Sequence, residues 1–220
     1  MVLENTNGVG RSIQVIRCQA DENGYEGLTA TASGSITLLN NSTFHSNGYG
    51  GGFFGANLYT VAGNITITGM SVDSPTDFSY NSGYGLNIFA NGNVSLNKVQ
   101  ANENIGPMGI YIDNMSIPGR SVSLTSSFII GNWNHGLEVF SKGSITLNTV
   151  DASKNGGYGV YLDNCIEDLV ITGQCNGSGN VTITAPKNYT NWFSYNGYDG
   201  LLVLSKGNIS LTNVSAEYNY

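Results

Sequence analysis

Two aspartates occur in almost the same sequence context, and a pair of carboxylates is what glycoside hydrolysis requires. Asp113 lies in YIDN and Asp163 lies in YLDN. Two coils of a regular solenoid between them would separate the carboxylates by about 9.6 Å, which suits an inverting glycosidase. Glu4 takes the same place in an earlier repeat, however, and a recurring position favours a structural role such as capping a turn. We therefore expect these acids to be structural.

The other side chains with chemical potential are scattered. The two histidines, His45 and His135, lie in different repeats, and neither has a serine or cysteine nucleophile motif beside it. No zinc spacing, phosphate-binding loop or nucleophile elbow occurs. Four acidic residues could bind calcium weakly, but their spacing is not that of a calcium site. They are Asp113, Asp163, Glu167 and Asp168. The sequence thus predicts no catalytic residue, no metal site and no cofactor.

Two of the three cysteines, Cys165 and Cys175, flank the segment CIEDLVITGQC. A disulfide between them would suit an oxidising compartment, and the alternative is two unrelated thiols. Lysine and arginine total 8 against 15 acidic residues, a net charge of -7, which argues against a nucleic-acid partner. No apolar run approaches the length of a membrane span. We expect an extracellular or cell-surface protein.

An asparagine followed by a glycine and an apolar residue recurs along the whole chain. Its members are Asn23, Asn47, Asn81, Asn104, Asn132, Asn155, Asn196 and Asn219. The steps between them are 24, 34, 23, 28, 23, 41 and 23 residues, so every second step has nearly the same length. A fixed period of this size indicates a solenoid whose insertions fall between alternate coils.

Within each period the apolar residues alternate with a period of two, as in Ile145-Thr146-Leu147 and Ile209-Ser210-Leu211. This alternation predicts strands with one buried face, and three such strands fit into each coil. We therefore predict an all-β fold: one single-stranded parallel β-helix over residues 1–220, with about eight coils and no helix. The chain is expected to start and end within a coil, and Cys18 to be a buried core thiol.

The asparagines have a structural explanation. An asparagine side chain pairs with backbone groups that a tight turn leaves free, and stacked amides bond to one another along the solenoid. We expect the glycine that follows each asparagine to supply a backbone angle that other residues resist.

Aromatic residues follow six of these asparagines, and they are Tyr25, Tyr49, Tyr84, Trp133, Tyr158 and Tyr198. They predict an aromatic stripe along one edge of the rod. Stacking from coil to coil explains such a stripe. The alternative is a carbohydrate-binding strip, because aromatic faces stack on sugar rings.

The chain resembles the right-handed parallel β-helix repeat proteins of bacterial surfaces and secretions. The matching stretches are GNISLTNVSAEYN, GSITLNTVDASKNGGYGVYLDN and NGYDGLLVLSKG. The resemblance implies the right-handed fold, but the scaffold carries lyases, adhesins and inert stalks alike. We expect a non-catalytic structural or adhesive solenoid that stacks end to end on itself as a filament, or on flanking repeats of a longer chain. The alternative is a carbohydrate-binding or carbohydrate-active module with its site among loops at 52–62, 110–120 and 161–179.

Overall fold

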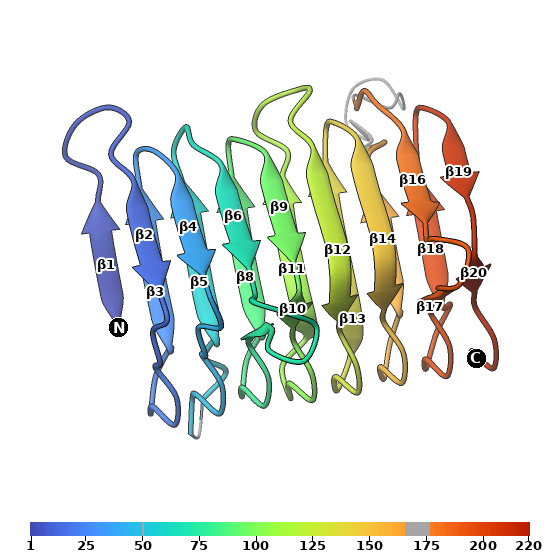
Figure 1. The fold of residues 1–220 in the computed structure, drawn as a ribbon, viewed down its shortest axis with the longest axis horizontal. Coiled ribbons are helices and arrows are strands. Elements are labelled where there is room, and N and C mark those ends of the chain that lie inside the picture. The colour runs from blue at the N-terminus through green and yellow to red at the C-terminus, as the bar shows by residue number, and fades with distance from the viewer. Residues whose placement is uncertain (50, 166–176) are drawn as a thin grey trace.

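The structure is a computed structural model that describes residues 1–49, 51–165 and 177–220. Its described residues form strands and turns, without a helix, and the named strands pair in parallel. They build two sheets that face each other across a core, as Figure 1 shows. The prediction of an all-β parallel solenoid is confirmed. Within the described ranges, no helix is present that could cross a membrane.

The first sheet has eight strands in the order β1-β3-β5-β8-β11-β13-β15-β18. From β3 onward, these are the strands that follow each turn glycine. Their bounds are β1 Val2–Asn5, β3 Leu28–Ala32, β5 Ala56–Thr60, β8 Leu86–Ala90, β11 Met108–Asn114, β13 His135–Ser141, β15 Val160–Asp163 and β18 Leu201–Leu204.

The second sheet has twelve strands, of which eight form one continuous path. These eight contain the repeated GSITL-like segments. They are β2 Ile13–Ile16, β4 Ile36–Leu39, β6 Ile65–Thr68, β9 Val94–Asn97, β12 Val122–Phe128, β14 Ile145–Asp151, β16 Val181–Thr184 and β19 Ile209–Leu211. The other four are two-residue strands: β7 Thr76–Asp77, β10 Val99–Gln100, β17 Asn191–Trp192 and β20 Val214–Ser215.

The two-residue strands belong to the predicted third strand of each coil. Isolated bridges join Gln19 to Thr43 and Thr43 to Asp77. The same ladder then runs through one residue per coil: Gln100, Phe128, Asp151, Trp192 and Ser215. Every coil therefore has a third strand, but this strand is only one or two residues long.

The winding is right-handed. In Figure 1 the second sheet lies in front with its strands pointing down, and the first sheet lies behind with its strands pointing up, while the chain advances from left to right. A path that goes up behind, crosses the top and descends in front as it advances is a right-handed helix.

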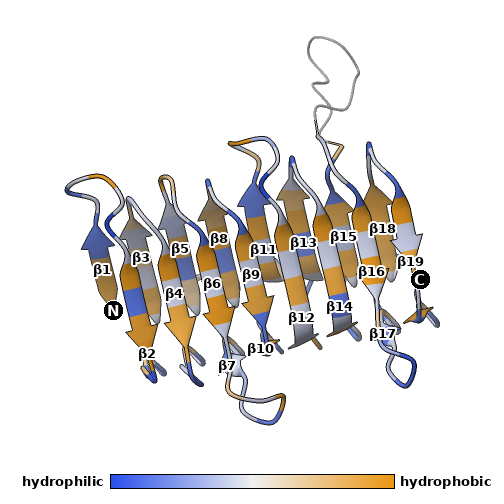
Figure 2. Ribbon diagram, turned by 45° about the horizontal axis from the view of Figure 1, so that its top comes forward, coloured by the Kyte–Doolittle hydropathy of each residue, from blue (hydrophilic) through white to orange (hydrophobic). Residues whose placement is uncertain are grey.

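The core follows from the two-residue alternation. In β4 the side chains of Ile36 and Leu38 are fully buried, whereas Thr37 and Leu39 lie half-buried on the outer face. Each buried aliphatic side chain of this size contributes about 1.5–3 kcal/mol relative to exposure. The alternation of hydrophobic and hydrophilic residues is visible along the strands in Figure 2. Within the core, the rings of Phe44 and Phe78 stack with their centroids 5.5 Å apart.

Two details of the sequence prediction are wrong. Cys18 is half-buried and packs at the edge of the core, because the third ladder begins in its own coil and no described coil covers it from the other side. The left-handed backbone angle falls on the residue before each column asparagine, not on the glycine that directly precedes the next strand, such as Gly27 or Gly159. These preceding residues are Glu22, Ser46, Tyr80, Glu103, Gly131, Lys154, Tyr195 and Tyr218, with φ between 52° and 72°.

Candidate functional site

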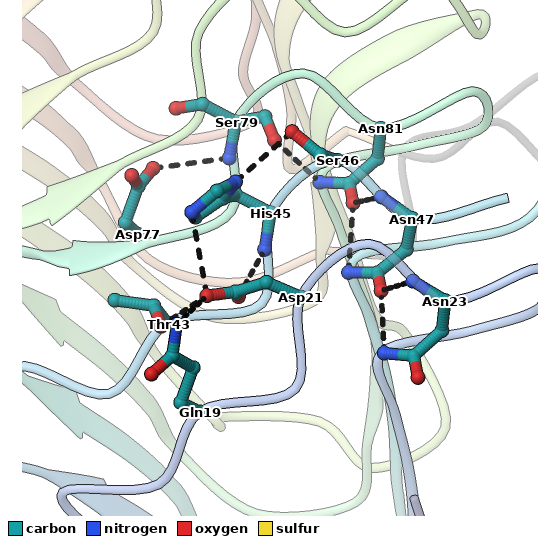
Figure 3. A network of polar contacts seen from close by, with 10 residues as sticks. All are labelled: Gln19, Asp21, Asn23, Thr43, His45, Ser46, Asn47, Asp77, Ser79 and Asn81. Atoms are coloured by element: carbon teal, nitrogen blue, oxygen red, sulfur yellow. Dashed lines mark hydrogen bonds and ion pairs between the residues drawn. The ribbon is translucent and has the colours of Figure 1, made fainter. Parts of the chain in front are cut away.

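The eight asparagines form one uninterrupted hydrogen-bonded ladder, the Asn ladder. At each of its seven steps, the backbone N–H and the side-chain Nδ2 of one asparagine both donate to Oδ1 of the asparagine in the next coil, over 2.8–3.2 Å. Figure 3 shows the first steps, from Asn23 through Asn47 to Asn81. The six asparagines from Asn47 to Asn196 are buried. The ladder thus satisfies polar groups that the turn would otherwise bury without partners.

The turn glycines explain why the ladder can be so close to the neighbouring coil. A Cβ atom on Gly136 would lie 2.5 Å from Nδ2 of Asn155, and one on Gly159 would lie 2.5 Å from Nδ2 of Asn196. The same approach, to the asparagine of the following coil, recurs at Gly27, Gly55, Gly85, Gly109 and Gly200. These glycines are therefore required by steric space and not by backbone angle.

The six aromatic residues predicted as a stripe separate into different environments. Tyr158 and Tyr198 contact each other, with ring centroids 5.4 Å apart, and Tyr84 contacts Phe54. Tyr25 contacts Phe53. Tyr49 and Trp133 are largely exposed, 75% and 76%, and make no ring contact within the described residues. The six do not form one stripe.

A different set of rings is continuous, and we call it the aromatic face. It runs over the outer side of the eight-stranded sheet and the adjoining turns through ring contacts of 5.0–6.3 Å. Its members are Phe54, Tyr84, Phe89, Tyr111, Phe140, Tyr161, Tyr158, His135 and Tyr198. Four of them, Phe89, Tyr111, Phe140 and Tyr161, are outward residues of β8, β11, β13 and β15, which the sequence analysis did not consider as a set. Their common signal is an outward position after the turn glycine.

Carboxylates lie among these rings. Glu138 is flanked in register by Tyr111 and Tyr161, and Phe140 is flanked by Asp113 and Asp163. Burial raises the pKa of Glu138. Burial, followed by the charges of Asp113 and Glu138, raises the pKa of Tyr111 to about 12. The aromatic face therefore carries acidic groups, and the phenol of Tyr111 is protonated at neutral pH.

The structure supports the capping role predicted for the two aspartates. Asp113 Oδ1 accepts a hydrogen bond from the backbone N–H of Met115 at 3.0 Å, and Asp163 Oδ1 accepts one from Cys165 at 2.8 Å. Each aspartate thus closes the turn after its strand. Glu4 does not repeat this bond: its Oε1 accepts from the hydroxyl of Thr6.

His135 stacks on Tyr158, with ring centroids 5.0 Å apart and planes 19° from parallel. Its Nδ1 accepts a hydrogen bond from the backbone N–H of Tyr158 at 2.9 Å, so that nitrogen carries no proton. Burial lowers the pKa of the imidazole, in keeping with this acceptor role. His135 is therefore held neutral as part of the aromatic face.

His45 lies in a separate polar network, drawn in Figure 3. Its Nε2 is 3.3 Å from Oδ2 of Asp21, and its Nδ1 is 3.0 Å from the hydroxyl of Ser46. Gln19 and Thr43 also donate to Oδ2 of Asp21, and the backbone N–H of His45 donates to Oδ1. The carboxylate of Asp21 therefore joins two coils as an acceptor. Ser46 is the neighbour of His45 in the chain and sits on a left-handed turn, so the trio resembles a turn cap more than a nucleophile with its base.

Several sequence predictions fall outside what the structure describes. Cys175, Glu167 and Asp168 lie outside the described residues, so the Cys165–Cys175 disulfide stays a prediction. Of the loops at 52–62 and 110–120, residues 56–60 and 110–114 are strand. Within the described residues, no group of three or more His, Cys, Asp or Glu side chains is arranged to hold a metal ion.

The sequence analysis missed one concave site, which we call the loop pocket. It has a volume of about 480 Å³ and is lined by Val72, Phe128, Asp151, Tyr189 and Trp192, among others. Its walls come from two loops, residues 69–75 before β7 and residues 185–190 before β17, and Figure 2 shows both projecting from the same edge of the rod. The signal in the sequence was the presence of extra residues at the same place in two coils.

No protein-family model matches this chain, and no curated protein or solved structure is significantly similar to it. The resemblance to bacterial surface and secreted β-helix proteins therefore stays a prediction.

Proposed function

We propose that the chain is a non-catalytic structural and adhesive rod, located outside the cell or on its surface, whose two end faces stack on further β-helix coils. The observation that carries this proposal is the Asn ladder, which runs through all eight coils without a break. A core and a ladder that repeat in every coil favour stiffness and extension. The partner coils belong to a second copy of the chain or to flanking repeats.

The ladder has a direction that makes its two ends complementary. Within the described residues, no donor reaches Oδ1 of Asn23, and no acceptor is bonded to the backbone N–H or Nδ2 of Asn219. One end thus offers an acceptor and the other offers two donors, the same groups that pair at every internal step. A coil stacked on either end would extend the ladder.

The end faces also expose apolar side chains that internal coils bury. Ile209 and Leu211 of β19 are 49% and 50% exposed, while their register partners Val181 and Ile183 are fully buried. At the other end, Leu3 of β1 is the register partner of the fully buried Ala30 but is itself only partly buried. Open strand edges of this kind pair with other strands. Stacking would bury these residues as Val181 and Ile183 are buried.

Sedimentation velocity over a concentration series tests the end faces. In the purified wild type, the coils available for stacking belong to other copies of the chain. The wild type is therefore expected to form linear oligomers of increasing length. Leu211→Lys places a charge on one end face and is expected to shift the population to monomer. Val61→Lys adds the same charge at an exposed turn on the side of the rod and should leave association unchanged. A wild type that stays monomeric at every concentration would contradict the proposal.

The aromatic face favours a second function, the binding of glycans. Rings that follow one another from coil to coil suit a chain of sugar rings lying along the rod, with Glu138 as a hydrogen-bond acceptor for hydroxyl groups. Because Asp113, Glu138 and Asp163 make the face acidic, it suits neutral glycans and repels uronic-acid polymers.

Affinity electrophoresis in gels that contain soluble polysaccharides tests this second function. Retardation by a neutral glycan, and its loss in Tyr111→Ala, is the expected result. Tyr195→Ala is the matched control, because Tyr195 stacks on Tyr218 away from the aromatic face. Absence of retardation in every neutral glycan, with the chain folded, would contradict glycan binding.

A further inference from the structure

The loop pocket is a concave site that takes part in neither the end faces nor the aromatic face. It lies over the outer ends of β12 and β14, where Phe128 and Asp151 are register partners. Trp192 of β17 pairs with Asp151 from the next coil. The loop at 185–190 adds Tyr189, and the loop at 69–75 adds Val72. At about 480 Å³, the pocket falls in the size range of small-ligand sites.

The carboxyl group of Asp151 lines the pocket, and one of its two oxygens is buried beneath the surface. Oδ1 of Asp151 is buried and makes no hydrogen bond within the described part of the chain. Burial raises the pKa of this carboxyl, and a hydrogen bond from Ser153 and the charge of Lys154 oppose the rise. A cation that entered the pocket would lie beside the carboxyl group of Asp151.

Two of the aromatic residues that line the pocket are exposed. Trp192 is 47% exposed and Tyr189 is 60% exposed, although both line the concavity. An aromatic side chain attracts a cation to the face of its ring, and tryptophan does so best. An ammonium group can satisfy both features at once, since it is a donor for Asp151 and a cation for the rings. A neutral hydroxyl satisfies only the first.

We propose that the loop pocket binds a protonated amine carried on an apolar body. The ammonium group pairs with Asp151, and the body of the ligand packs against Trp192, Tyr189 and Val72. Two sources offer this chemistry, the amino sugar of a glycan and an alkyl amine such as a lysine side chain. This site is separate from the end faces and from the aromatic face, so it stands independently of the proposed function.

The chain contains two tryptophans, and this makes the pocket easy to monitor. Trp133→Phe removes the exposed tryptophan outside the pocket and leaves Trp192 as the sole indole reporter. This variant is titrated with glucosamine, with glucose as the uncharged match, and with butylamine, while the indole fluorescence is recorded. A saturable change with glucosamine and none with glucose is expected. A response to glucosamine alone identifies an amino sugar, and a response to butylamine as well identifies the ammonium group as sufficient.

Asp151→Asn in the same background tests the role of the carboxylate. It keeps the shape of the side chain and removes its charge, and affinity for glucosamine is expected to fall at least tenfold. Asp73→Asn, in the loop at 69–75, removes one negative charge from the same region and should leave affinity unchanged. Circular dichroism verifies that both variants fold. The proposal is overturned by a flat titration with both amines, by equal binding of glucose, or by equal losses in the two variants.

Discussion

The side-chain Nδ2 of Asn132 donates a hydrogen bond to Oδ1 of Asn155 in the next coil, 2.9 Å away, and its backbone N–H donates to the same oxygen at 3.0 Å. One side-chain oxygen thus serves two donors of the neighbouring coil. The relation repeats at every step of the Asn ladder, so the removal of a single amide affects the coils on both sides of it.

Asn132→Ala should lower the free energy of unfolding by about 3 kcal/mol, because it leaves the backbone N–H and Nδ2 of Asn104 buried without their acceptor. Urea denaturation measures the change. Asn23→Ala is the matched control, since that asparagine is only half-buried and its Oδ1 accepts no hydrogen bond within the described residues, so its removal leaves no donor of another coil unpaired. Equal losses in the two variants would show that the ladder contributes nothing beyond the turn itself.

Gly159→Ala should lower the midpoint of urea denaturation, because its methyl group would lie 2.5 Å from Nδ2 of Asn196 and 2.6 Å from the carbonyl oxygen of Gly200. Gly24→Ala serves as the control, because nothing lies within 4 Å of its Cβ position. A tolerated Gly159→Ala would contradict the close approach of neighbouring coils at the ladder.

The neutral state of His135 predicts a pH dependence. Because burial lowers the pKa of its imidazole in the folded state, the unfolded chain binds the proton more readily. The stability of the wild type should therefore be retained above pH 6.5, the ordinary pKa of histidine, and fall as the pH decreases through the lowered value. His135→Gln keeps an acceptor for the N–H of Tyr158 but does not titrate, so it should lose less stability between pH 8 and pH 5. Parallel curves for the two proteins would be evidence against a neutral, buried His135.

The carboxyl group of Asp151 predicts the opposite pH dependence, a stability that falls as the pH rises. Burial raises the pKa of its carboxyl in the folded state, so its contribution to stability is fully present below 3.8, the ordinary value, and is lost as the pH rises through the raised pKa. Asp151→Asn should consequently be more stable than the wild type at pH 7, and the difference should shrink as the pH falls. Thermal unfolding of the two proteins at several pH values measures it. A variant that is less stable at pH 7 would mean that the carboxylate is well solvated or paired.

The fold could be predicted from the sequence because its causes are local and periodic. Asn132 and Asn155 are 23 residues apart, and the alternation in Ile145-Thr146-Leu147 sets the buried face directly. The cause of the turn glycines was misread, because a spacing shows that a small residue is required but does not separate a backbone angle from a close approach. Gly159 illustrates this, since its restriction comes from Asn196 in another coil.

The candidate surfaces could be predicted only in part. Tyr158 and Trp133 both follow column asparagines, yet Tyr158 lies in the aromatic face and Trp133 is exposed, because the side-chain direction depends on the turn around it. The loop pocket brings Val72 and Tyr189 to one site from distant parts of the chain. The coils that carry these loops lie four steps apart in the third-strand ladder. Both loops reach the pocket over the coils between them, and how far an inserted loop extends is not revealed by the repeat.

Negative-stain electron microscopy of the purified chain over a concentration series tests the central claim most directly. At about 4.8 Å per coil, a single copy is a rod roughly 40 Å long. We predict rods at low concentration and unbranched fibres with an axial repeat near that length at high concentration, because the two end faces complement each other. Discrete short rods at every concentration would contradict stacking through the end faces.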